Sequence, residues 1–265
     1  MIFDIDLLMM LIDSHAHLEM PEFKRDLEAV IQRAKQSGVE YIFTVGTEKK
    51  DWTRTLEIAN SHPSLYAILG VHPHNAKEID DQTYPTLREL CREEKVKAYG
   101  EIGLDFFRNL SSREVQLKRF REQIALAKEL RLPIVVHDRE AHPETLEILK
   151  SEKAEECGGI IHCFSGDYEM AKVCMDMGFY ISVPGSITFK NAGSLREVVK
   201  KIPLESLLVE TDAPFLTPEP FRGKRNEPSY VRYTAEKVAE IKNISFEKVA
   251  EMTTENALRV YRLKL

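Results

Sequence analysis

Eight short apolar runs, each followed by a charged stretch with helical spacing, constrain the fold of this chain more than any other feature. The runs lie at 7–12, 39–46, 65–71, 96–100, 133–136, 159–161, 179–183 and 207–210. The helical stretches follow at about 22–37, 47–60, 86–94, 112–130, 142–152, 168–177, 193–201 and 230–241. Strict alternation of this kind indicates parallel strands joined by crossover helices, and eight such units close into a (β/α)8 barrel. A further helical stretch at about 246–261 would, with the one before it, cover the flank or floor of the barrel.

The length of the chain agrees with this architecture. Its 265 residues match the roughly 250 residues of a typical (β/α)8 barrel. We find no linker, low-complexity tract or shift in composition, so residues 1–265 are predicted to form a single domain. The competing architecture is an open doubly wound sheet, which would carry a glycine-rich phosphate-binding turn after its first strand. No such turn follows the run at 7–12, and the barrel is therefore favoured.

Charge and cysteine content narrow the class of protein. A formal net charge of −6 argues against non-specific coating of nucleic acid, which needs a broad basic surface, but not against an enzyme that binds a few phosphates locally. The four cysteines lack CxxC spacing and predict reduced thiols. Asp4 and Asp6 stand where a signal peptide would carry cations. The run at 7–12 is too short to cross a membrane. We expect a soluble, cytoplasmic and monomeric protein.

Polar residues stand at the ends of six of the eight apolar runs, where parallel strands of a barrel form one rim. They are His15, His17, His72, Glu101, His137, His162 and Asp212. Burying several ionisable groups together is costly unless they are paired or bind a cation. Imidazole nitrogens with carboxylate oxygens are a ligand set for zinc, manganese, nickel, iron or cobalt. Without His72, which lies outside the proposed ligand set, four histidines and two carboxylates remain. These six exceed the need of one catalytic ion, whereas two ions sharing Glu101 as a bridge would use them all.

Seven motifs then carry a resemblance to a known family. They are Asp13-Ser-His-Ala-His17, Gly70-Val-His-Pro-His74, Gly100-Glu-Ile-Gly-Leu-Asp105, Pro133-Ile-Val-Val-His137, His162-Cys-Phe-Ser-Gly166, Glu210-Thr-Asp-Ala-Pro214 and Arg222-Gly-Lys-Arg-Asn-Glu-Pro228. In this order they resemble the TatD family of metal-dependent deoxyribonucleases in the amidohydrolase superfamily. The resemblance implies a distorted TIM barrel with two divalent metal ions (Mg, Mn or Zn). It also implies that His15, His17 and Asp212 hold one ion, that His137 and His162 hold the other, and that Glu101 bridges them. The chain departs from the family in its longer leading segment, which leaves Met9 and Met10 as alternative starts.

Further residues are assigned roles beside this ligand set. Mainly from the resemblance, Asp212 is predicted to be a ligand and the general base that accepts a proton from the attacking water. His72 is a candidate donor to a substrate phosphate, with a packing role as the alternative. Arg225 lies in the basic segment 222–225 and is the favoured phosphate contact, because a guanidinium matches phosphate geometry. Asp105 is either structural or orients a ligand histidine.

Aromatic residues also follow these motifs. Phe106, Phe107, Phe164 and Phe215 could stack on a terminal base, although core packing is the more common role of any one of them.

The function expected from these features is hydrolysis of phosphodiester bonds in DNA by water activated by two metal ions. Glu101 and Asp212 would be the catalytic residues, and single strands or frayed ends, cut exonucleolytically, the favoured substrate. The alternative enzyme is an ester, amide or lactone hydrolase of the same superfamily, since fold alone does not decide between them. A barrel without turnover, acting as a scaffold, is a third class, and the complete ligand set counts against it.

Overall fold

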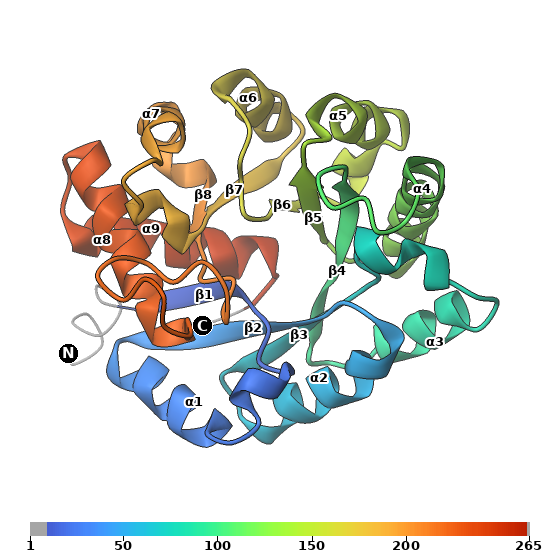
Figure 1. Cartoon of the computed structure of the whole chain (residues 1–265), viewed down its shortest axis with the longest axis horizontal. Coiled ribbons are helices and arrows are strands. Elements are labelled where there is room, and N and C mark those ends of the chain that lie inside the picture. Colours follow the sequence, from blue (N-terminus) through green and yellow to red (C-terminus); the bar gives the residue numbers. More distant parts are fainter. Residues whose placement is uncertain (1–9, 264–265) are drawn as a thin grey trace.

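Eight parallel strands pair in sequence order, from β1 to β8, in a computed structural model that describes residues 10–263 (Figure 1). The strands are β1 Leu11–Ala16, β2 Val39–Gly46, β3 Leu65–Leu69, β4 Val96–Asp105, β5 Ile134–Arg139, β6 Gly159–Ile161, β7 Phe179–Val183 and β8 Leu207–Val209. The first and last strands meet just beyond β8, where Ala16 forms a parallel bridge with Ala213. The sheet is therefore a nearly closed barrel, which confirms the predicted fold class.

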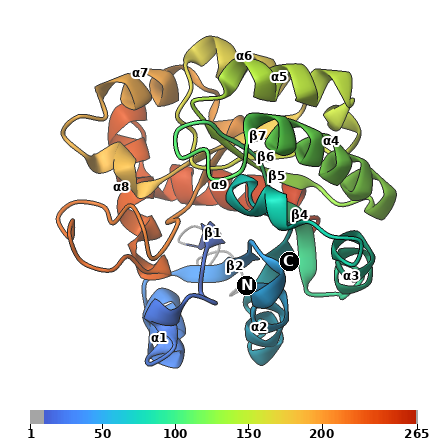
Figure 2. The same cartoon turned by 45° about the vertical axis from the view of Figure 1, so that its right-hand side comes forward.

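A ring of helices surrounds the sheet (Figures 1 and 2). The α-helices are α1 Leu27–Gln36, α2 Lys49–Ser61, α3 Thr83–Leu90, α4 Arg113–Leu130, α5 His142–Ser151, α6 Tyr168–Asp176, α7 Gly193–Lys201, α8 Val231–Lys242 and α9 Phe246–Val260. Short 3-10 helices are η2 Pro21–Phe23, η3 Pro73–Glu78, η4 Ala154–Glu156, η5 Gly185–Thr188, η6 Leu204–Ser206 and η7 Pro228–Tyr230. Among the helices of the described part of the chain, none is both long enough and apolar enough to cross a bilayer.

Most predicted elements lie where the sequence indicated, and the differences concentrate at the site. β2, β6, β7 and α7 have the predicted bounds. The first strand was predicted at 7–12, and its predicted end is wrong, because β1 spans Leu11–Ala16. Residues 7–9 lie outside the described residues. β4 continues to Asp105 and β5 to Arg139, whereas apolar content alone ended them at 100 and 136. β3 instead ends at Leu69, and α1 begins at Leu27 after the separate turn of η2. α3 begins at Thr83, earlier than the predicted stretch at 86–94, and η3, which precedes it, was not predicted.

The buried apolar side chains form two clusters. The larger cluster fills the space between the strands and the surrounding helices. The smaller one includes a member from nearly every strand together with Leu258, Val260 and Tyr261 at the end of the chain's last helix. Its strand members are Ile12, Phe43, Val45, Ile68, Ala98, Val135, Ile160 and Leu208. It is the interior of the barrel, and the end of α9 closes its floor.

The inner cluster determines which later residues face the barrel axis. Side chains of a strand alternate between its two faces, so a residue two positions beyond an inner residue lies on the same face. This relation connects Val135 with His137, Ile160 with His162, and Leu208 with Glu210. In β1 and β4 the pairing register shifts, between Asp13 and Ala16 and between Gly100 and Ile102. Such irregularities re-aim side chains next to functional sites, and here they fall beside His15 and Glu101.

Candidate metal centre

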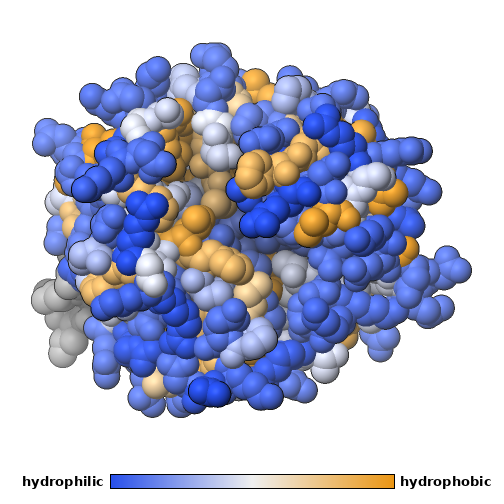
Figure 3. Space-filling view, in the orientation of Figure 1, coloured by the Kyte–Doolittle hydropathy of each residue, from blue (hydrophilic) through white to orange (hydrophobic). Residues whose placement is uncertain are grey.

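A cavity of about 910 Å³ opens at the carboxyl ends of the strands. Figure 3 shows the face into which it opens, with hydrophobic side chains bordering a central hollow. Its lining includes six of the residues singled out in the sequence, namely His17, His72, Glu101, His137, His162 and Asp212. His15 is buried beside them. The rim at the strand ends therefore brings together the whole predicted ligand set.

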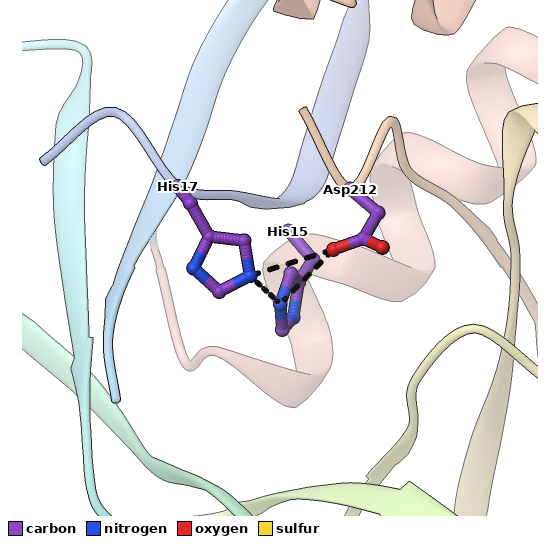
Figure 4. Close-up of side chains that lie close together, drawn as sticks. All are labelled: His15, His17 and Asp212. Carbon is purple, nitrogen blue, oxygen red and sulfur yellow. Dashed lines mark hydrogen bonds and ion pairs between the residues drawn. The ribbon is translucent and has the colours of Figure 1, made fainter. Parts of the chain in front are cut away.

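The first group consists of His15, His17 and Asp212 (Figure 4). The Nε2 atoms of His15 and His17 lie 3.3 Å apart. Oδ1 of Asp212 lies 3.4 Å from Nε2 of His17 and 3.9 Å from Nε2 of His15. The outer nitrogen of His17, Nδ1, faces the Val45 carbonyl at 3.3 Å and Glu19 at 3.3 Å. The inner nitrogens of both rings thus converge with a carboxylate oxygen on one point.

Backbone conformation places Asp212 in this group. Its φ of 55° is uncommon for a residue other than glycine. The Asp212 N–H donates to the His15 carbonyl at 2.9 Å, and the Asp212 carbonyl accepts from Phe215 N–H at 2.8 Å. The segment after β8 is therefore tied to β1, and the two strands carry their ligands to the same place.

Glu101 stands between the first group and a second one. Its Oε2 lies 3.4 Å from Nε2 of His15. Its Oε1 lies 2.7 Å from Nδ1 of His137, 3.4 Å from Nε2 of His162 and 3.5 Å from Nε2 of His72. One oxygen thus faces each group, which is the position required of a bridging carboxylate.

These spacings fit bound cations. Ligands about 2.1 Å from a tetrahedral ion lie roughly 3.4 Å from one another. The separations in the first group, from 3.3 to 3.9 Å, are close to that value. The Nε2 atoms of His15 and His17 face each other at 3.3 Å. Without a cation, one of them must carry a proton to donate to the other, whereas a shared cation can accept a lone pair from both. Imidazole and carboxylate together suit Zn²⁺ and Mn²⁺ better than ions that prefer oxygen alone.

The charge state of the cluster follows from burial and proximity. Burial tends to raise the pKa of Glu101, but the imidazoles of His162, His72 and His137 outweigh it and hold that pKa well below its usual range. The pKa of Asp212 is lowered in the same way by His17, His162 and His15 against the effect of burial. Burial and the neighbouring His162, which stacks on the His15 ring at 3.6 Å, lower the pKa of His15. Against the effect of burial, neighbouring carboxylates raise the pKa of His17, His137 and His162. The centre therefore presents ionised carboxylates beside a neutral His15 imidazole.

Two acidic residues contact the proposed ligand histidines on the side away from the centre. The sequence analysis gave Glu210 no role and left the role of Asp105 open. Oε1 of Glu210 lies 3.0 Å from Nδ1 of His162, close in distance although not aligned as a hydrogen bond. Asp105 Oδ2 contacts Nε2 of His137 at 3.2 Å and Nε2 of His74 at 2.8 Å, so the orienting role considered for Asp105 has a structural basis. Carboxylates in this position fix the orientation of metal-binding histidines. Glu210 could have been found from its place two residues before Asp212 in the same motif.

His72 lies in the cavity, beyond the end of β3, at the start of η3. Its Nδ1 accepts the backbone N–H of His74 at 3.1 Å. The neutral ring then carries its proton on Nε2, toward Glu101 and the cavity. Burial and the nearby His137 lower the pKa of His72 to about 4, so the ring is neutral at pH 7. The ligand atoms of His72, Glu101 and His137 lie close enough together to hold an ion, but a proton on Nε2 suits His72 to donating a hydrogen bond.

Arg225 does not line the cavity in the described structure. Its guanidinium forms two hydrogen bonds with the carboxylate of Asp26, at 2.7 and 2.8 Å, and stacks over Phe23. The segment between β8 and α8, orange in Figure 2, thus packs beside α1. A contact between Arg225 and a substrate phosphate stays a prediction, and it requires this pair to open.

The four aromatic candidates divide into two kinds. Phe106 and Phe164 are buried in the core. Phe215 is 48% exposed and lines the cavity, and its ring lies 6.2 Å from that of His17. Phe107 is 52% exposed. Only the latter two, among the four, have the accessibility that stacking on a base requires.

Comparison with known proteins gives concordant results. A family model described as TatD related DNase matches residues 12–262. An uncharacterized metal-dependent hydrolase, YabD of Bacillus subtilis, is 50% identical over 254 residues, covering 96% of this chain and 100% of the relative. A 3'-5' ssDNA/RNA exonuclease TatD of Erwinia tasmaniensis is 37% identical, covering 95% and 99% of the two chains. The crystal structure of the TatD homologue YJJV of Escherichia coli K12 superposes with a TM-score of 0.91 at 34% identity, covering 97% and 100%.

Proposed function

This chain belongs to the TatD family of metal-dependent hydrolases, and from that premise we propose that it hydrolyses phosphodiester bonds of DNA with two divalent metal ions. Single strands and frayed ends are the proposed substrate, cut from an end. The proposal is supported by the name of the Erwinia tasmaniensis relative, which describes a 3'-5' exonuclease of single-stranded DNA and RNA.

The position of Glu101 carries the two-metal part of the proposal. One oxygen of this buried carboxylate faces His15, and the other faces His137 and His162. Two proposed ligand groups lie on its two sides. His17 and Asp212 complete the group with His15, and His137 and His162 form the other. A single ion would leave one group of buried ionisable side chains without a counter-charge, at a considerable cost in free energy.

The residues of the chain would divide the chemistry between them. When bound, the two ions supply Lewis acidity toward phosphoryl oxygens and lower the pKa of a water nucleophile. Asp212, ionised and 14% exposed at its side chain, lies where it can accept the proton of the attacking water. His72 would donate a hydrogen bond from Nε2 to a phosphoryl oxygen, because its Nδ1 is occupied by the His74 N–H. Glu101 would hold the two ions together.

A degradation assay tests the proposal. Metal-free protein is reloaded with Mg²⁺, Mn²⁺ or Zn²⁺ and given single-stranded and frayed duplex DNA labelled at either the 3' or the 5' end. We expect shortening from one end, and a loss of at least about a hundredfold in Asp212→Asn and Glu101→Gln, by analogy with the loss of a catalytic general base. Asp176→Asn, an exposed carboxylate paired with Lys172, is the control and should retain activity.

Two results would contradict the proposal. The first is a wild-type protein that leaves every DNA substrate intact while it opens an ester, amide or lactone. The second is full activity in both active-site variants with their metal content unchanged.

A further inference from the structure

We propose that Arg108 and Arg139 form a phosphate-binding subsite on the β4–β5 side of the cavity, which holds the nucleic acid strand next to the bond that is cut. This inference rests on the proposed function, since it assigns residues that bind its substrate. Arg108 and Arg139 both line the cavity, and no lysine does so among the described residues.

Both arginines are placed by the strands that carry the metal ligands. Arg139 is the last residue of β5 and lies two positions beyond His137, on the same face and about 6.6 Å further along the strand. That spacing is of the order of the distance between consecutive phosphates in a nucleic acid strand. Asp105, the last residue of β4, pairs in register with Arg139, and Oδ1 of Asp105 accepts the backbone N–H of Arg108 at 2.7 Å. The two side chains therefore emerge from neighbouring strand ends.

The guanidinium groups of Arg108 and Arg139 combine two properties: they line the cavity, and they have no anionic partner among the described residues. Arg33 and Arg225 are paired with carboxylates of Glu227 and Asp26. Within residues 10–263, by contrast, neither Arg108 nor Arg139 is paired with a carboxylate. Both side chains are exposed to the cavity mouth in a protein of net charge −6. Unpaired guanidinium groups at a concave site are suited to bind phosphate oxygens, often through two hydrogen bonds at once.

Phe107 holds one of these groups in place. The guanidinium of Arg139 lies over the Phe107 ring at 4.0 Å from its centroid. Stacking of this kind orders a long side chain and leaves its N–H groups free in the plane for hydrogen bonds. The Arg139 donors are thus pre-oriented before substrate arrives, which lowers the entropy lost on binding.

Binding without turnover tests the subsite directly. A fluorescein-labelled oligothymidylate is titrated by anisotropy into protein carrying Asp212→Asn, at several salt concentrations. Adding Arg139→Gln or Arg108→Gln should weaken binding by about tenfold, as expected for a lost charge-assisted contact. Each should also reduce the slope of log affinity against log salt by about 0.7, the value for one phosphate contact on a single strand. Arg139→Lys should recover most of that slope, because it keeps the charge.

Arg113→Gln is the matched control. Arg113 also stacks on a phenylalanine, Phe106, at 4.3 Å, but does not line the cavity. Its affinity and salt slope should equal those of the parent protein. A second test uses the same substitutions in otherwise wild-type protein and compares kcat/KM for the oligonucleotide with kcat/KM for bis(4-nitrophenyl) phosphate. In the Arg108 and Arg139 variants, the value for the oligonucleotide should fall about tenfold more than the value for the small substrate. In Arg113→Gln, any change should be equal for both substrates.

The outcomes separate this inference from the proposed function. DNA cleavage by the wild type, with Arg108→Gln and Arg139→Gln behaving like Arg113→Gln, overturns the subsite and leaves the nuclease. Arginine-dependent binding of the oligonucleotide without any cleavage overturns the nuclease and supports the subsite. Absence of both binding and cleavage overturns the two together.

Discussion

Nδ1 of His162 lies 3.0 Å from Oε1 of Glu210, a carboxylate that is fully shielded from solvent. The same oxygen accepts the backbone N–H of Cys163 at 2.8 Å, and the other oxygen accepts the Ser182 hydroxyl at 2.5 Å. Glu210 is therefore held by two hydrogen bonds, and its charge lies against the ring of His162, whose Nε2 faces Glu101. The orientation of one proposed ligand depends on a residue outside the ligand set.

We expect Glu210→Gln to lower metal affinity about 10- to 100-fold, the range for partners of metal-binding histidines. The amide has only one accepting terminal atom, so it cannot face His162 and Cys163 with an oxygen on one side and accept the Ser182 hydroxyl on the other. Isothermal titration of metal-free protein with Zn²⁺ or Mn²⁺ measures the change. Glu227→Gln is the control, because Glu227 is a buried carboxylate paired with Arg33 outside the centre. Equal affinities in the two variants would refute the positioning role of Glu210.

His15→Ala is expected to reduce the metal content from two ions per chain to one. His15 contributes Nε2 to the group with His17 and Asp212, while His137 and His162 lie around the other oxygen of Glu101. Elemental analysis after dialysis measures the ratio. His62→Ala, at the end of α2 and bonded to Ser64, should keep both ions. Retention of both ions in His15→Ala would show that the assignment of this pair is wrong.

Gly103→Ala should destabilise the fold and damage the site. The φ of Gly103 is +143°, and a Cβ there would lie 2.0 Å from the carbonyl oxygen of His137. Strain and displacement of β5 should cost at least about 2 kcal/mol of unfolding free energy, and turnover should fall because His137 moves. Gly193→Ala, where a Cβ meets nothing within 4 Å, should be neutral or stabilise by about 0.4 to 1 kcal/mol. Denaturant unfolding of both variants makes the comparison.

The Asp26 carboxylate predicts a stability change at low pH. Hydrogen bonds from Arg225, against a small effect of burial, and the charges of Arg225 and Arg33 lower its pKa from 3.8 to about 2. Because the folded pKa lies below the unfolded one, the stabilisation is present above pH 3.8 and is lost as the pH falls toward 2. Asp26 is partly exposed, so the contribution is less than about 1 kcal/mol.

Thermal unfolding of wild type and Asp26→Asn between pH 2 and 7 checks this. The variant should be less stable at neutral pH, and the two melting temperatures should converge near pH 2. A difference that persists unchanged at the lowest pH would assign it to packing instead of charge.

The sequence predicted the barrel well because the runs that build it are apolar and regularly spaced. β2, for example, contains five buried residues in succession at its end and was found with its bounds. The sequence-based prediction of strand ends failed where strands carry the candidate site residues. β4 includes Glu101, Gly103 and Asp105, which have low strand propensity, yet all three are buried, and Gly103 and Asp105 pair with β5. β5 likewise continues past its apolar residues to include His137 and Arg139. Polar residues at strand ends look like loop residues in the sequence, so the predicted strands ended too early.

The proposed ligand set could be predicted as a group, but the arginines that line the cavity around it could not. Equivalent strand ends bring His15, His137 and His162 to one rim by topology alone. Whether a particular arginine faces that rim depends on side-chain pairing, which strand topology does not determine. Arg225 is held by Asp26, a residue 199 positions away, and nothing in the local sequence indicates that pair. Arg108 and Arg139 line the cavity instead.

Two backbone hydrogen bonds join the start of the barrel to its end, from Asp212 N–H to the His15 carbonyl and from His17 N–H to the Ala213 carbonyl. All three residues of the first ligand group take part in this seam. During synthesis the group is therefore incomplete until the segment around residue 213 has left the ribosome. A chain truncated before that segment would have most of the strands but would lack Asp212, and with it the complete group of candidate ligands. Closure of the barrel and assembly of this candidate ligand group therefore occur in the same step of folding.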